Sequence, residues 1–143
     1  MKIEEILQDK GHDVVTIGES RSVLDAARVL VDHNIGALVV TEGESPTGIL
    51  TERDILRVTA RSPGELDSIH VATVMTLKPI TAMPEDQLAE TMDVMTESKI
   101  RHLPVVEGGR LVGIVSIGDL LNACRVVAEE ENSHLRQYIQ GAG

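Results

Sequence analysis

Two short stretches of the chain place a hydroxyl side chain at a strand-to-helix junction, with an aspartate three residues later. They are Gly-Ile-Leu-Thr-Glu-Arg-Asp at residues 48–54 and Gly-Ile-Val-Ser-Ile-Gly-Asp at residues 113–119. The N-terminus of a helix offers backbone amides and a positive dipole end to a phosphate, and Thr51 or Ser116 adds a donor. Asp54 or Asp119 can accept both hydroxyls of a ribose, as carboxylates do in dinucleotide-binding folds. This combination suits a nucleotide.

The same spacing also has a purely structural interpretation. A Ser or Thr at the N-cap followed by an acid at the third helical position forms a capping box, in which the hydroxyl bonds the third amide. The acid then complements the positive end of the helix dipole. Either motif alone is therefore consistent with capping and nothing more.

The two motifs belong to a repeat with an offset of 65 residues. Eleven of the 49 aligned pairs that start at Val14 and Pro79 are identical, and they include the pairs Asp54 with Asp119 and Gly48 with Gly113. A repeat of this kind fixes the unit of the fold. Units of about 60 residues are marginally stable alone, so we expect them to share an interface.

Hydrophobic periodicity places both motifs in an α/β fold (an α+β sandwich) of two β-α-β-β-α units with pseudo-two-fold symmetry. We divide the chain into a first motif with its N-terminal segment (1–62), a linker (63–70), a second motif (71–125) and a C-terminal helical extension (126–143). Helices are expected over 3–8, from Ser22 to Asn34, from Thr51 to Arg61, from Glu85 through Met95, and from Ser116 through Ile139. Strands are expected over 14–17, 37–40, from Gly48, over 80–81, 103–106 and 111–115, with turns at 42–47 and 107–110.

Composition excludes several classes of function. The 143-residue chain has a net charge of −10, no Trp, no Phe and one Tyr, so it lacks the basic stripes and aromatic platforms of nucleic-acid binding proteins. No stretch approaches the ~18 apolar residues of a membrane span. The single cysteine, Cys124, is expected to be a small buried hydrophobe. We expect a cytoplasmic protein with an aliphatic core, in which Val31 belongs to the apolar face of its helix.

The repeated sequences resemble cystathionine-β-synthase (CBS) domains. The resemblance depends on Ile-Gly-Ala-Leu-Val-Val from residue 35, Ile-Arg-His-Leu-Pro-Val-Val from residue 100 and the two motifs above, and it extends over residues 1–140. It is closest to small stand-alone bacterial proteins that consist of one CBS pair. The resemblance implies a regulatory module, without enzymatic activity, that binds an adenosine nucleotide such as AMP, ATP or NAD. It also implies a homodimer, to which the C-terminal helix with Leu135, Tyr138 and Ile139 contributes.

By the same resemblance, Thr51 and Ser116 would contact phosphate or ribose oxygens, and Asp54 and Asp119 would hold the ribose diol. Arg53, Arg101 and His102 are the best-placed groups for phosphate, although His102 is equally compatible with a partly buried strand position. The copies differ, because Gly36 and Ala37 stand where the second copy has Arg101 and His102. The remaining residues expected to line nucleotide pockets are Thr16, Ile17, Ile35, Leu38, Thr81, Ala82, Ile100, Leu103 and Pro104.

Other chemistries have less support. The five histidines show no metal-ligand spacing, and Glu52 with Asp54 has no accompanying nucleophile–base pair. A protein-interaction or dimerisation module that needs no ligand is the main alternative.

Overall fold

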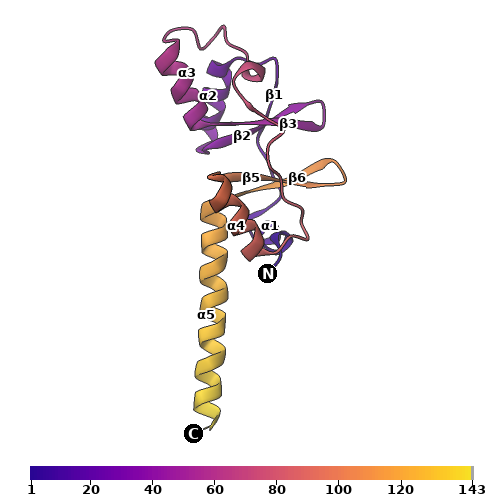
Figure 1. The fold of residues 1–143 in the computed structure, drawn as a ribbon, viewed down its shortest axis with the longest axis vertical. Helices are drawn as coiled ribbons and strands as arrows, with labels where there is room; N and C mark the ends of the chain where they lie inside the picture. The colour runs from indigo at the N-terminus through magenta and orange to yellow at the C-terminus, as the bar shows by residue number, and fades with distance from the viewer. Residues whose placement is uncertain (143) are drawn as a thin grey trace.

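Two α/β units lie one above the other in the computed structural model, which describes residues 1–142 (Figure 1). The first unit contains β1 (Thr16–Gly18), α2 (Val23–His33), β2 (Ala37–Glu42), β3 (Ser45–Thr51) and α3 (Glu52–Arg61). The second contains α4 (Leu88–Ser98), β5 (His102–Glu107), β6 (Arg110–Ser116) and α5 (Ile117–Ala142). The expected fold of two related α/β units is therefore confirmed.

Local sequence explains where α2 begins and ends. The Ser22 side chain accepts a hydrogen bond of 3.0 Å from the Asp25 amide, which caps the first turn. Asn34 ends the helix in the left-handed conformation, with φ of 52°. Lys99, 65 residues later, ends α4 in the same conformation. Both repeats therefore use the same turn to enter their central hairpin.

The sheets differ between the units. In the first, β1 pairs in parallel with β2, β2 pairs antiparallel with β3, and β4 (Thr76–Leu77) adds to β3. In the second, β5 and β6 form an antiparallel hairpin whose turn uses Gly108 and Gly109 at positive φ.

The prediction of a strand over residues 80–81 is wrong. The second copy has only one parallel bridge at this point, between Ala82 and Val105. Pro84 has no amide to continue a ladder, and the Met83 amide instead bonds the Asp86 carboxylate at 2.8 Å. The turn expected over 42–47 is also shorter, because β3 already begins at Ser45.

The two units exchange short flanking segments. Helix α1 (Ile3–Lys10) packs into the core of the second unit through Ile3, Ile6 and Leu7. The 3₁₀ turn η1 (Val71–Thr73) packs into the core of the first unit through Val71. Each core therefore includes residues from the chain segment that precedes the other repeat, which ties the two units together.

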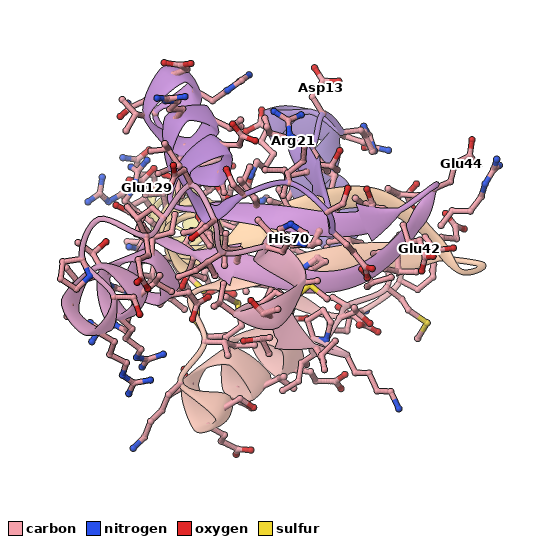
Figure 2. The ribbon with its side chains drawn as sticks, turned by 90° about the horizontal axis from the view of Figure 1, so that it is seen from above. Asp13, Arg21, Glu42, Glu44, His70 and Glu129 are labelled. Atoms are coloured by element: carbon pink, nitrogen blue, oxygen red, sulfur yellow. The ribbon has the colours of Figure 1, made fainter. Side chains whose placement is uncertain are left out.

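Helix α5 leaves the second unit and projects away from the body of the molecule (Figure 1). Its distal apolar side chains are exposed: Leu135 by 60%, Tyr138 by 77% and Ile139 by 67%. In the view from above, Glu129 of α5 lies on the opposite side from Glu42 and Glu44, which mark the hairpin end (Figure 2).

Two side chains expected to be buried are exposed. Cys124 is exposed on α5 because Leu120 and Ala123 occupy the face of that helix that packs on the core. Val31 is 77% exposed on α2, whose buried face is formed by Val23, Ala26 and Leu30. Within residues 1–142, no helix has both the length and the apolar character needed to cross a membrane.

Candidate functional site

A cleft of about 760 Å³ lies between the two repeats and is lined by residues of both. Its volume is within the range of about 300–1,000 Å³ that is typical of small-molecule sites. Its walls come from the β3–α3 junction, the segment that follows β4, and the starts of β5 and α5. The lining residues are Gly36, Ile49, Thr51, Glu52, Arg53, Asp54, Leu56, Arg57, Thr76, Lys78, Pro79, Ile80, Lys99, Ile100, Arg101, His102, Ser116 and Ile117.

Some of the residues that the sequence predicted for the site meet in this cleft, and others lie outside its lining. Those in the lining are Gly36, Thr51, Arg53, Asp54, Ile100, Arg101, His102 and Ser116. Those outside it are Thr16, Ile17, Ile35, Ala37, Leu38, Thr81, Ala82, Leu103, Pro104 and Asp119. Several of the second group, including Leu38 and Leu103, are buried core residues.

The N-terminus of α3 is capped and still presents a donor. The Asp54 carboxylate accepts hydrogen bonds from the Thr51 amide at 2.9 Å and from the Thr51 hydroxyl at 3.1 Å. The Asp54 amide donates to the Thr51 hydroxyl oxygen at 3.4 Å, and the Glu52 amide donates to the Gly36 carbonyl at 3.0 Å. None of these bonds uses the backbone amide of Arg53, the residue between Glu52 and Asp54, so this amide can donate to a ligand. The capping interpretation is therefore correct here and does not exclude ligand binding.

The charge of the cleft is opposite to that of the chain. Five cationic side chains line it, those of Arg53, Arg57, Lys78, Lys99 and Arg101, against the two acids Glu52 and Asp54. The chain as a whole carries a net charge of −10. A concentration of positive charge in a concave site focuses the field on an anionic ligand.

Arg57 also contacts Asp54, with 3.6 Å between Nη1 and Oδ1. The two residues separate the cleft from a smaller hollow of about 380 Å³, which both also line. Because the Arg57 side chain is 58% exposed, it has room to turn toward a ligand in either space.

Gly36 allows the two repeats to approach closely at the cleft. A Cβ atom on Gly36 would lie 2.6 Å from Oε1 of Glu52 and 3.3 Å from Cε1 of His102. Burial lowers the pKa of the His102 imidazole below its ordinary value, and the charges of Arg101 and Lys10 lower it further, against the opposing effect of Glu52. At neutral pH the ring is therefore uncharged and can donate or accept a hydrogen bond.

The second strand-to-helix junction has a similar cap, and a lysine from α1 contacts its carboxylate. The Asp119 carboxylate accepts from the Ser116 amide at 2.8 Å, and the Asp119 amide donates to the Ser116 hydroxyl oxygen at 3.1 Å. Lys10 of α1 also donates to Asp119, with 2.7 Å between Nζ and Oδ2. Burial alone would raise the pKa of Asp119, but the bonds from Lys10 and Ser116 outweigh it and hold that pKa below its usual value.

Sequence reasoning missed several residues of the cleft, among them Arg57, Lys78 and Lys99. Arg57 lies one turn after Arg53 on α3, so helical spacing from Arg53 could have identified it. Lys78 and Lys99 could not be identified in this way, because both lie at positive φ outside regular elements. Within residues 1–142, no group of three or more His, Cys, Asp or Glu side chains is placed to hold a metal ion.

The chain belongs to the CBS domain family, whose model matches residues 3–61 and 71–126. It is 40% identical over 125 residues to the mitochondrial CBS domain-containing protein CBSX3 of Arabidopsis thaliana. That match covers 84% of this chain and 61% of the plant protein, so the chain spans about three fifths of that relative. It is also 37% identical over 108 residues to the CBS domain-containing protein YhcV of Bacillus subtilis, covering 75% of this chain and 76% of that protein.

Solved structures show the same tandem arrangement. A CBS-domain protein from Agrobacterium tumefaciens superposes with a TM-score of 0.82 and 38% identity, covering 86% of this chain and 98% of that one. A CBS domain protein from Pyrobaculum aerophilum complexed with AMP has a TM-score of 0.75 and 29% identity. That match covers 83% of this chain and 89% of the other. The CBS domain pair of protein MJ0100, complexed with 5′-methylthioadenosine and S-adenosyl-L-methionine, has a TM-score of 0.76 and 27% identity, covering 86% and 98%. The chain is thus a tandem CBS pair.

Proposed function

We propose that this protein is a non-catalytic regulatory module that binds an adenosine nucleotide in the cleft between its two CBS repeats. The observation that carries the proposal is the composition of the cleft. The N-terminus of α3 and the Asp54 carboxylate lie there beside five cationic side chains. A phosphate and a ribose diol are the groups that these two features bind in other nucleotide sites.

The ligands of the structural relatives support the adenosine part of the proposal. AMP, 5′-methylthioadenosine and S-adenosyl-L-methionine share an adenosine group, and only AMP carries a phosphate. The phosphate part therefore depends on the cations of this chain. Arg53 and Arg101 have guanidinium groups that bind phosphate in bidentate fashion, while Lys78 and Lys99 act as point charges.

In this arrangement Asp54 binds the ribose diol, and the Arg53 amide and the Thr51 hydroxyl face the phosphate. The base lies against aliphatic side chains of the cleft such as Ile49, Ile80 and Ile100. AMP, ATP and NAD all present these groups.

A thermal-shift comparison tests the proposal. AMP, ATP or NAD at millimolar concentration should raise the unfolding temperature, because a ligand that binds only the folded state stabilises it by mass action. UMP at the same concentration has the same ribose and phosphate and should raise it less. No shift with any adenosine nucleotide would instead favour a module that acts without a ligand.

We also propose that the protein forms a homodimer. The exposed apolar side chains Leu135, Tyr138 and Ile139 on the projecting part of α5 are the observation in favour. Apolar side chains gathered on one exposed element commonly mark an interface.

A further inference from the structure

The carboxylate of the second strand-to-helix junction is held by Lys10, the last residue of α1. Its Nζ lies 2.7 Å from Oδ2 of Asp119 and 2.9 Å from the carbonyl oxygen of Ile114. The Lys10 and Asp119 side chains are 32% and 27% exposed. This is a partly buried ion pair that joins the N-terminal helix to the second repeat.

The first repeat has no ammonium in the equivalent place. The 65-residue offset aligns Lys10 with Met75, an apolar residue that packs against the core of the first unit. The cation nearest Asp54 is Arg57, which lies 3.6 Å away and is 58% exposed. Asp54 lines the cleft, whereas Ser116 lines it without Asp119.

We propose that the ion pair with Lys10 prevents the Asp119 carboxylate of the second repeat from binding a ribose. Each chain therefore offers one open nucleotide site, at Asp54. This inference rests on the proposed function. An ammonium bonds a carboxylate more strongly than a neutral hydroxyl does, because the bond is charge-assisted on both sides. Folding also places Lys10 beside Asp119, since Ile3, Ile6 and Leu7 anchor α1 in the second core. A ribose must therefore compete with an intramolecular partner present at high effective concentration.

Calorimetric titration with AMP tests the inference through stoichiometry. The wild-type protein should bind one AMP per chain, and Lys10→Met should bind two, because the variant keeps the helix and removes the ammonium. Lys2→Met is the matched control. It removes the other ion pair of this segment, between Lys2 and Glu85 at 2.8 Å, and should leave the stoichiometry at one.

The double variant Lys10→Met with Asp119→Ala should return the stoichiometry to one. Two AMP molecules on the wild-type chain, or one on Lys10→Met, would overturn the inference while leaving the proposed function intact. If none of these proteins bound AMP, the proposed function would fail, and the one-site inference would fail with it.

The ion pair itself has a test that needs no ligand. In a carboxyl-detected NMR titration, Lys10→Met should raise the pKa of Asp119, and Lys2→Met should not. An unchanged Asp119 pKa in Lys10→Met would show that Lys10 does not hold this carboxylate in solution.

Discussion

Asp54 lies both in a helix cap and in the lining of the cleft, and its sequence context was compatible with capping alone or with ligand binding. Its carboxylate closes the capping box with Thr51, and it also lines the cleft between the repeats. The spacing of a hydroxyl and an acid is compatible with both capping and nucleotide binding, because both use the N-terminal end of a helix. Only the structure could show which of the two equivalent aspartates faces open space, since the partner of Asp119 comes from a distant segment, α1.

Arg101 is predicted to recognise phosphate. Arg101→Ala should weaken AMP binding about tenfold or more, since hydrogen bonds to charged groups contribute about 1.5–3 kcal/mol. Adenosine, which lacks the phosphate, should bind equally well to both proteins. Arg125→Ala is a suitable control, because Arg125 pairs with Glu129 along α5. Calorimetry with both ligands decides, and an equal loss for AMP and adenosine would mean that Arg101 shapes the pocket instead.

His102 should make the stability of the unliganded protein depend on pH. Its pKa is lowered in the folded state, chiefly by burial, so below about pH 6.5, the ordinary pKa of histidine, the unfolded chain binds more protons at this position. Stability should therefore fall as the pH drops through 6.5 toward the folded-state pKa. The urea midpoint of the wild type should fall more between pH 8 and pH 5.5 than that of His102→Gln, which retains the other four histidines. Parallel midpoints would contradict the lowered pKa.

At the scale of elements, hydrophobic periodicity predicted the helices and the central hairpins. It was wrong about a short strand, in which only a few residues pair. Thr16–Gly18 forms a strand, while the corresponding segment near Ala82 forms one bridge, because Pro84 interrupts the ladder. Cys124 and Val31 were assigned to buried faces from their apolar character alone. Which face of a helix is buried depends on the tertiary packing, and at these positions neighbouring residues fill the core instead.

The projecting part of α5 leads to a prediction about assembly. Light scattering at micromolar concentration should give twice the chain mass of 15.5 kDa. The double variant Leu135→Glu with Ile139→Glu should dissociate the dimer, because dimerisation would then bury unpaired carboxylates at the interface between the two α5 helices. Val31→Glu alters an apolar residue on α2 that is more exposed than Leu135 or Ile139, and it should leave the mass unchanged. A monomeric wild type would exclude the homodimer, and dissociation by Val31→Glu alone would place the interface on α2.

For the molecule as a whole, the important contrast is between an acidic surface and a cationic cleft. The chain carries −10 overall, yet cations outnumber acids by five to two in the cleft. The repeat in the sequence predicted the two-unit architecture, because each copy is one structural unit. It could not predict the whole cationic cleft, since Lys78 and Lys99 join Arg53 and Arg101 there only when the units stack.

Calorimetric titration of AMP into the wild type and Asp54→Ala shows whether this carboxylate binds the nucleotide. We predict saturable binding to the wild type and a loss of about 5- to 150-fold in Asp54→Ala, because about 1–3 kcal/mol of charged hydrogen bonding to the ribose is removed. Urea unfolding without ligand should separately show the cost of the lost cap, about 1 kcal/mol. Equal AMP affinity in the two proteins, with only the stability reduced, would mean that Asp54 is a helix cap and not a nucleotide ligand.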